Sequence, residues 1–341
     1  MIARIRAYPM LVLLLPLIAA ILICNHFYPL RQPYRKTPPN ALQTQLYGRL
    51  EAAGLSGDEL ATVGALTLGY KEALTPELRH LFAASGAAHV LAVSGLHTGI
   101  IYGLLWWLLT LGGRFKPMHE DKVRRRLISM LIIGCMWAYA WLTGMTPSVV
   151  RAVLMVTIFE VGRMLYKRAF SLNTVAAAAV LILLAHPSDL WSVSFQLSFA
   201  ATAAIVICAP LISNVPLFRR SHLLSYVLGI ILVSLAAQLG TLGITIYYFK
   251  QASVYFLLTN LMVLPLATLL VPCGLITVAL GGSTIGLLAG KVTHGLAWLL
   301  NHAVGWVEHL PGSTVPAQAD GYMVALYYLI LVLFFIFATK K

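Results

Sequence analysis

The sequence predicts an all-α, polytopic transmembrane helical bundle with about nine or ten membrane segments. Of the 341 residues, 60% are hydrophobic and 10% are charged, whereas a soluble globular domain carries about 25% charged residues. Apolar runs close to the roughly 20 residues that a spanning helix needs recur along the whole chain. This composition excludes soluble, disordered and collagen-like classes, and the four cysteines stand singly in apolar runs, which excludes a disulfide scaffold.

The apolar runs divide the chain into three parts. We expect an N-terminal transmembrane anchor at 1–28, a short extramembrane helical segment at 29–87 and a transmembrane domain at 88–338. The first run follows Arg4 and Arg6 and lacks a small-residue cleavage site, which favours an uncleaved span. The candidate membrane segments are 9–28, 88–111, 127–144, 147–165, 171–186, 190–212, 223–249, 252–281, 284–310 and 321–338.

The extramembrane segment is expected to be helical because it carries helix-start signals rather than strand alternation. Ser56 with Glu59 fits a capping box, and Thr75-Pro76 fits a capped start with proline at the first helical position. The apolar spacing from Leu60 to Leu68 suits a helix that lies against the bilayer or the bundle.

Lysine and arginine clusters predict the orientation, because they favour the cytoplasmic side. If all ten segments cross, every cluster lies on one side, so we expect a multi-pass protein of the bacterial inner membrane with a cytoplasmic N-terminus. These clusters hold 15 cations and two acids and account for the net charge of +13. No basic patch is left over to predict nucleic-acid binding from charge alone. The clusters comprise Arg4, Arg6, Arg114, Lys116, Lys122, Arg124, Arg125, Arg126, Arg163, Lys167, Arg168, Arg219, Arg220, Lys340 and Lys341.

Segment 284–310 is amphipathic, since Lys291, His302 and His309 fall on one stripe at 100° per residue. We favour an interfacial helix with this stripe in water over a pore-lining span. The choice decides on which side of the membrane the C-terminus lies. The histidine spacings do not suit a zinc pair, so we expect no metal and no cofactor.

Ionisable groups inside a membrane are functional candidates because they are costly to bury. Arg151 lies one turn inside its segment, where it either faces a polar cavity or snorkels outward. Glu160 is expected to pair with Arg163 at the cytoplasmic end.

The run around Ser94 and His97 allows three interpretations. Gly95, Gly99 and Gly103 form a bare stripe that favours close approach of another backbone. Alternatively, Ser94 and His97 point into a cavity near a broken or re-entrant helix. A Ser/His nucleophile is a third possibility, although no acid partner accompanies it.

Three further polar residues interrupt apolar segments, namely Gln196, Gln238 and Asn260. Each alone is typical of an interhelical hydrogen bond. Together with His97 and Arg151 they would line one water-filled interior.

These runs resemble the competence domain of the ComEC family of bacterial inner-membrane proteins over roughly residues 50–335. The matching motifs are HVLAVSGLH at 89–97, TGMTPSVVRA at 143–152, FQLSFA at 195–200, AQLGTL at 237–242, YF at 248–249, and Asn260-Leu261 leading to Pro265.

The resemblance implies a channel that carries single-stranded DNA inward during natural transformation, without catalysis of its own. The matching polar contributors are Ser94, Gly95, His97, Arg151, Gln196, Gln238 and Asn260. It also implies other competence proteins as partners, such as a DNA receptor and a cytoplasmic helicase, and allows a homo-oligomer in the bilayer. Tyr102, Trp106 and Trp107 would stack bases or, more commonly, anchor the protein at the interface.

Family members typically add an extracellular domain and a metallo-β-lactamase-like domain. Here about 59 residues stand in the first place, and the ten histidines include no H-x-H-x-D-H run. No nuclease activity is therefore transferred. Two other functions stay open: a secondary transporter of a small anion with Arg151 as counter-charge, and an intramembrane hydrolase built on Ser94 and His97.

Overall fold

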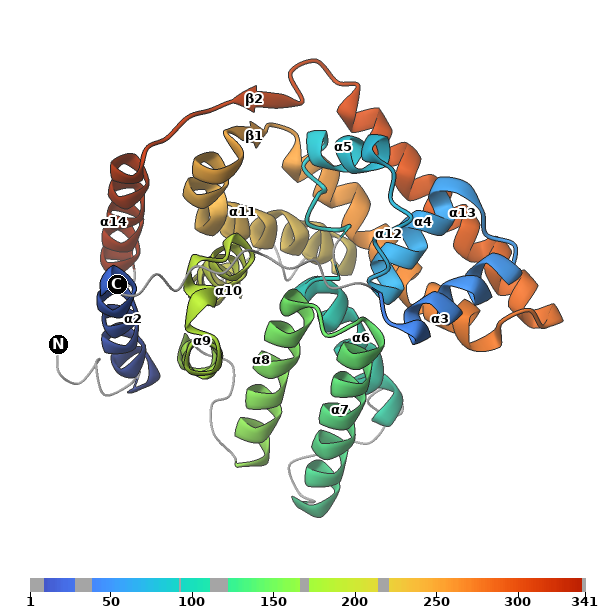
Figure 1. Cartoon of the computed structure of the whole chain (residues 1–341), viewed down its shortest axis with the longest axis horizontal. Coiled ribbons are helices and arrows are strands. Elements are labelled where there is room, and N and C mark those ends of the chain that lie inside the picture. The colour runs from blue at the N-terminus through green and yellow to red at the C-terminus, as the bar shows by residue number, and fades with distance from the viewer. Residues whose placement is uncertain are drawn as a thin grey trace.

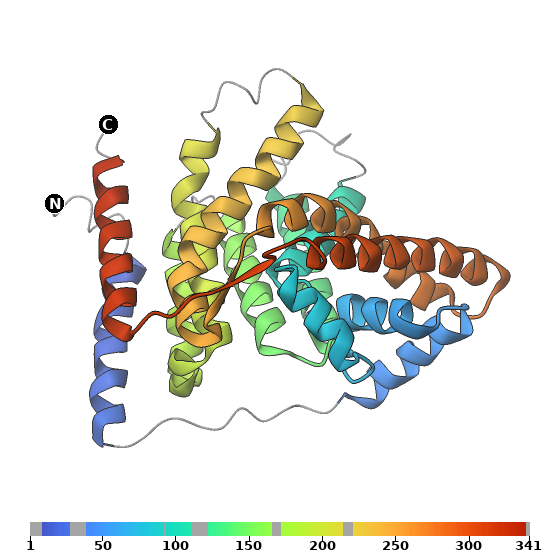
Figure 2. The ribbon, with the colours of Figure 1, turned by 90° about the horizontal axis from the view of Figure 1, so that it is seen from above.

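The computed structural model confirms the all-α class, with about 82% of the structure in helices (Figures 1 and 2). It describes residues 9–27, 39–91, 93–110, 122–165, 172–213 and 221–338. In chain order the elements are α2 (Pro9–Phe27), α3 (Ala41–Ala52), α4 (Gly57–Val63), the π-helical η1 (Gly64–Leu68), α5 (Pro76–Ala84), α6 (Gly95–Leu109), α7 (Lys122–Leu142), α8 (Pro147–Met164), α9 (Leu172–Ala185), the 3₁₀-helical η2 (Pro187–Trp191), α10 (Val193–Ser213), α11 (His222–Phe249), β1 (Gln251–Ser253), α12 (Phe256–Leu280), α13 (Thr284–Glu308), β2 (Thr314–Pro316) and α14 (Gly321–Ala338).

Three helices of the described chain are long and apolar enough to cross a membrane: α11, α12 and the part of α10 from Val193 to Pro210. Shorter apolar helices cover Val12–Asn25, Gly95–Leu109, Leu172–Ala185 and Gly321–Phe335. The number of spans stays a prediction. Many of the cations used to predict orientation lie outside the described residues, namely Arg4, Arg6, Arg114, Lys116, Lys167, Arg168, Arg219, Arg220, Lys340 and Lys341.

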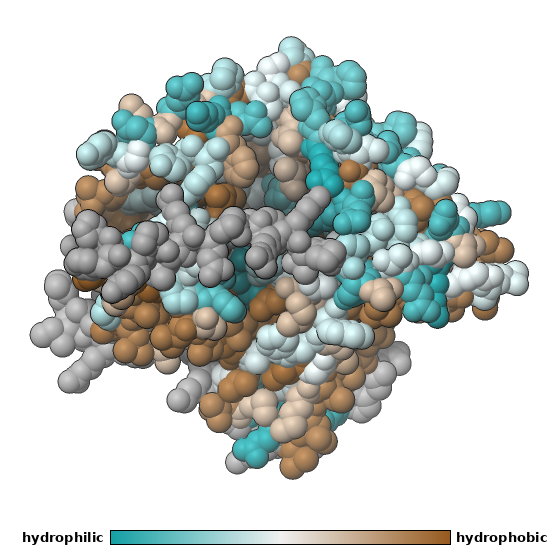
Figure 3. Space-filling model, viewed as in Figure 1, coloured by the Kyte–Doolittle hydropathy of each residue, from teal (hydrophilic) through white to brown (hydrophobic). Residues whose placement is uncertain are grey.

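Hydrophobic surface is extensive, since large apolar side chains are exposed on α2, α7, α11, α13 and α14. Figure 3 shows it over α7 and α8, whereas hydrophilic surface gathers over α5 and α3. On α7, Leu127, Met130, Leu131 and Trp141 are all more than half exposed. An exposed apolar face of this extent is typical of a surface covered by lipid.

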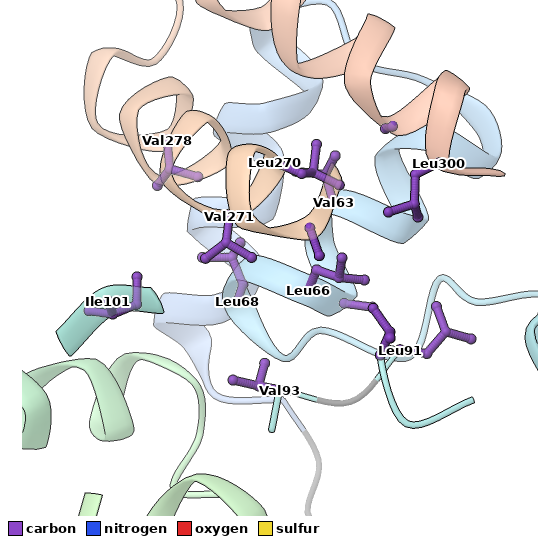
Figure 4. Close-up of a cluster of buried hydrophobic side chains, with 14 of the residues drawn as sticks. Val63, Leu66, Leu68, Leu91, Val93, Ile101, Leu270, Val271, Val278 and Leu300 are labelled. Carbon is purple, nitrogen blue, oxygen red and sulfur yellow. The ribbon is translucent and has the colours of Figure 1, made fainter. Parts of the chain in front are cut away.

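The stretch between the first two apolar runs supplies the centre of the main core. Val63, Leu66 and Leu68 are fully buried and pack with α12 and α13 through residues such as Leu270 and Leu300 (Figure 4). Of the two surfaces expected for this stretch, the bundle is therefore the one that it contacts. Its boundary as an extramembrane segment stays a prediction.

The helix-start signals of this stretch are confirmed at one site and corrected at another. Thr75 caps α5, since its Oγ1 accepts a hydrogen bond from the Leu78 N–H at 3.1 Å. Ser56 precedes α4 but makes no capping bond, because Gly57 enters the helix with φ +60°. A capping box that the pattern missed joins Asn40 and Gln43 at the start of α3.

The expected segment 88–111 is helical only from Gly95 onward. Val90 and Val93 before it are buried in the core without forming a helix. Apolar composition continues through both parts, so hydropathy alone merged them. At about 1.5 Å per residue, the 15 residues of α6 are shorter than a 30 Å hydrocarbon core.

The glycine stripe on α6 does not receive a neighbouring backbone. A Cβ at Gly95, Gly99 or Gly103 would meet no described atom within 4 Å. Close helix approach occurs elsewhere: a Cβ at Gly240 of α11 would lie 2.5 Å from the Ala200 carbonyl of α10. The packing expected for the stripe is therefore wrong within the described chain.

Glu160 joins α6, α7 and α8 through a buried cluster in which both carboxylate oxygens accept hydrogen bonds. Its side chain is fully buried and accepts hydrogen bonds from Tyr102 of α6 at 2.6 Å and Ser129 of α7 at 2.6 Å. Arg163 lies 2.8 Å from the same carboxylate, which confirms the expected pair. The Tyr102 hydroxyl thus belongs to this cluster, and a role of its ring in base stacking or interfacial anchoring stays a prediction.

The amphipathic helix α13 packs its small and apolar side, including Ala297 and Val304, against the core. Lys291, His302 and His309 are exposed. It runs crosswise to α14 (Figure 2) and is not among the helices suited to span. These observations agree with the interfacial interpretation, which stays a prediction.

A short antiparallel ribbon sets the position of α14. Gln251 of β1 pairs with Pro316 of β2, which brings the start of α14 beside the end of α11. Tyr327 and Tyr328 of α14 then donate hydrogen bonds to the carbonyls of Leu239 and Gly240 at 2.6 and 2.8 Å.

Removing the Glu160 carboxylate should destabilise the protein. Glu160→Ala leaves Tyr102, Ser129 and Arg163 without their buried acceptor, and breaking a buried charged pair costs about 3–5 kcal/mol. We expect a clear fall in the melting temperature of the detergent-purified protein, measured by tryptophan fluorescence. Exposed Glu72→Ala is the control. Equal melting temperatures for the two variants would contradict the role of the cluster.

Two glycines of α13 should respond oppositely to alanine. A Cβ at Gly290 would overlap the Ala53 carbonyl, whereas one at Gly295 meets nothing within 4 Å. Overpacking costs about 1–3 kcal/mol, while an unhindered Gly→Ala change in a helix gains about 0.5–1 kcal/mol. We expect Gly290→Ala to lower the melting temperature and Gly295→Ala to keep or raise it. The reverse order would show that this contact is not tight.

Candidate functional site: helix starts around His97 and Arg151

The starts of α8 and α12 both bond to the backbone that precedes α6. The Ser148 hydroxyl, at the start of α8, donates to the Val93 carbonyl at 2.7 Å just before α6 begins. On the other side, the Thr259 hydroxyl of α12 donates to the Ser85 carbonyl at 2.7 Å. These two bonds hold the stretch from 85 to 94 between α8 and α12.

Ser94 and His97 form the start of α6. The Ser94 N–H donates to His97 Nδ1 at 3.2 Å, and the Ser94 Oγ lies 3.1 Å from the same nitrogen. Because Nδ1 accepts, the neutral imidazole carries its proton on Nε2. That Nε2–H is buried without a hydrogen-bond partner among the described residues.

Arg151 does not snorkel. Only 2% of it is exposed, and its guanidinium donates from one nitrogen to the carbonyl and hydroxyl of Ser194, at 3.0 and 2.6 Å. Ser194 stands in the first turn of α10, so the bond joins the starts of α8 and α10. Its Nε–H remains buried without a described partner.

The three amides are placed differently. Gln196 lies two residues after Ser194, and its Nε2 donates to the Leu190 carbonyl at 3.0 Å. Asn260 of α12 donates to the Ser234 hydroxyl of α11 at 3.1 Å, while its Oδ1 is buried without a described partner. Gln238 is half-buried on α11, and no hydrogen bond within the described chain joins its side chain to the others.

Five of the seven expected residues therefore gather around the starts of α6, α8 and α10. These are Ser94, Gly95, His97, Arg151 and Gln196. Each helix start adds about half a positive charge and free N–H groups. Two donors, His97 Nε2–H and Arg151 Nε–H, are buried and unsatisfied in the described chain, so this is a place where an anionic group would find partners.

Sequence reasoning missed the serines that support these residues. Ser148 donates a hydrogen bond to the Val93 carbonyl, whereas the hydroxyls of Ser194 and Ser234 accept hydrogen bonds from Arg151 and Asn260. Serine in apolar helices is common and often bonds its own helix, so type alone did not single them out. Position did carry a signal, since Ser148 and Ser194 both stand in the first turn of a helix that bears a candidate residue.

The Ser94–His97 contact lacks the third group of a nucleophilic triad. His97 Nδ1 accepts the backbone N–H of Ser94, and the described chain offers no carboxylate within hydrogen-bond distance of Nε2. A base needs an orienting partner to activate a hydroxyl. The described residues also hold no group of three or more His, Cys, Asp and Glu side chains suited to a metal.

Fold and site together define a helical membrane protein with buried hydrogen-bond donors at converging helix starts. A family model described as Competence protein matches residues 66–341. The chain belongs to this family, which confirms the resemblance found in its motifs.

Curated relatives agree with this assignment. The chain is 29% identical over 286 residues to ComE operon protein 3 of Bacillus subtilis (strain 168), covering 84% of this chain and 34% of the relative. It is 27% identical over 208 residues to the uncharacterized protein YcaI of Escherichia coli (strain K12), covering 61% and 27%. Competence protein ComA of Neisseria gonorrhoeae is 29% identical over 160 residues, covering 46% and 22%.

The chain thus spans about a third or less of the length of these three relatives. No solved structure matches it.

A serine-reactive probe should not label this site. Without an orienting acid, Ser94 Oγ keeps the low nucleophilicity of an ordinary hydroxyl. We expect a fluorophosphonate to leave the purified protein unlabelled, as read by mass spectrometry, beside a serine hydrolase as positive control. Labelling that disappears in Ser94→Ala would contradict this and favour the hydrolase function.

Proposed function

We propose that this chain is a channel component for the uptake of single-stranded DNA during natural transformation, and that it is not an enzyme. The observation that carries the proposal is that His97, in the first turn of α6, and Arg151, in the second turn of α8, each keep a buried donor without a partner among the described residues. Family membership supplies the link to competence.

The chemistry of the strand fits these donors. A phosphodiester is a fixed anion that accepts hydrogen bonds from arginine, backbone N–H groups and helix N-termini. Each buried donor left without a partner costs about 1–3 kcal/mol, so a phosphate that satisfies either donor lowers the barrier to leaving water. Contacts of this kind carry no sequence information, which suits uptake of any sequence.

The two donors sit in surroundings suited to passage rather than to retention. Arg151 already bonds Ser194, so it offers a phosphate only its remaining N–H groups. A few weak contacts allow a strand to enter and leave, which conduction requires.

We place the chain in the bacterial inner membrane with a cytoplasmic N-terminus, beside a DNA receptor and a cytoplasmic helicase as partners. A homo-oligomer would enlarge the pathway. The same donors would suit a smaller anion, and the transformation experiment below separates that alternative from DNA uptake.

The test is natural-transformation frequency in a transformable strain that carries this chain. Deletion should abolish transformation, and the wild-type gene should restore it. His97→Ala or Arg151→Ala should lower the frequency by at least about tenfold, because a hydrogen bond to a charged group is worth about 1.5–3 kcal/mol. Arg151→Lys should rescue only in part, since lysine lacks the planar fork of donors.

His302→Ala and Lys291→Ala are matched controls, because both side chains are exposed on α13. Immunoblots of the membrane fraction separate loss of function from loss of protein. Full transformation by both site variants would remove the site assignment. Normal transformation in the deletion strain would overturn the DNA-uptake function and favour small-anion transport.

A further inference from the structure

A small cavity opens where α10, α11 and α14 meet. Its volume is about 170 Å³. It lies near the first turn of α10, two residues beyond Ser194, which holds Arg151. Its lining residues are Gln196, Ile244, Tyr247, Tyr248, Gly321 and Val324.

The lining combines two aromatic rings, one amide and three apolar residues. Tyr247 and Tyr248 are 45% and 38% exposed, and their rings meet edge to face, with centroids 5.0 Å apart at 90°. The cavity is therefore bordered by two ring surfaces at right angles. Such rings stack planar groups by their faces and accept edges laterally.

Gln196 supplies the polar edge. Its Nε2 donates to the Leu190 carbonyl, which fixes the amide and leaves one N–H and the Oε1 for a ligand. An amide with one free donor and one acceptor pairs with the edge of any nucleobase. It does not choose among bases, because each presents a donor or an acceptor there.

The size suits a small planar group. Sites for drug-sized ligands occupy about 300–1,000 Å³. A cavity of about 170 Å³ has room for one planar ring system, with the rest of a nucleotide outside it.

We propose that this cavity is a stacking subsite that holds one base of the passing strand at a time, with Tyr247 and Tyr248 as the platform and Gln196 at the base edge. The inference rests on the proposed function. It assigns different parts of the strand to different groups: Arg151, which bonds Ser194 at the start of α10, would contact a phosphate, and the two tyrosines would contact a base. Stacking on aromatic rings tolerates every sequence.

Lining the cavity distinguishes Tyr247 and Tyr248 from another exposed tyrosine of α11. Tyr226 stands on the same helix and is 50% exposed, yet it lines neither this cavity nor the apolar one between α2, α9 and α10. It is therefore a matched control for loss of an exposed tyrosine ring from α11.

The experiment uses the full chain in nanodiscs with a single-stranded oligonucleotide that carries 5-iodouracil, irradiated and mapped by mass spectrometry. We expect cross-links at Tyr247 or Tyr248. The double variant Tyr247→Ala/Tyr248→Ala should lose them and lower transformation about tenfold, as loss of a stacking contact would. Tyr247→Phe/Tyr248→Phe keeps both rings and should retain cross-linking and transformation, and Tyr226→Ala should behave as wild type.

Absence of cross-links at both tyrosines, together with normal transformation in the double alanine variant, would overturn the stacking subsite. If the deletion strain still loses transformation, the proposed function survives that outcome. Loss of transformation in Tyr226→Ala to the same degree would also overturn the stacking subsite, because the effect would then follow from removal of any exposed ring on α11.

Discussion

The interior depends on two hydrogen bonds that hold the backbone before α6, one at the Ser85 carbonyl and one at the Val93 carbonyl. Backbone groups that leave water must find partners, and in a membrane protein irregular backbone is tolerated only where protein or a water-filled cavity surrounds it. Thr259 and Ser148 provide two of those partners from opposite sides. Because α6 starts just after Val93, these bonds also fix the position of its first turn, in which His97 is fully buried.

Two buried polar sites of this protein contrast in how completely they are satisfied. The carboxylate of Glu160 receives bonds from Tyr102, Ser129 and Arg163, which is typical of a structural junction. Arg151 and His97 keep donors that no described group accepts. The first arrangement is closed to further partners, whereas the second leaves donors that a bound group would satisfy, and this contrast is the physical basis of the proposed function.

Much of the fold could be predicted from the sequence because apolar run length and local spacing are strong signals. The Glu160–Arg163 pair follows from i,i+3 neighbours on a helix. The start of α6 could not be predicted from the sequence, because Val90 and Val93 are as apolar as the helix after them. The role of Arg151 required tertiary structure, since its partner Ser194 lies 43 residues away and nothing in the intervening sequence announces the contact.

The position of α14 has a consequence for the order in which the protein matures. Gly321 and Val324 wall the cavity beside Tyr248, yet about 70 residues separate the two parts in the sequence. At about 5–20 residues per second, the ribosome delivers this wall roughly 4–14 s after α11. During that interval the α10–α11 pair stands with its cavity open on one side. The cavity is thus completed only when α14 has been synthesised, after the helices that form its other walls.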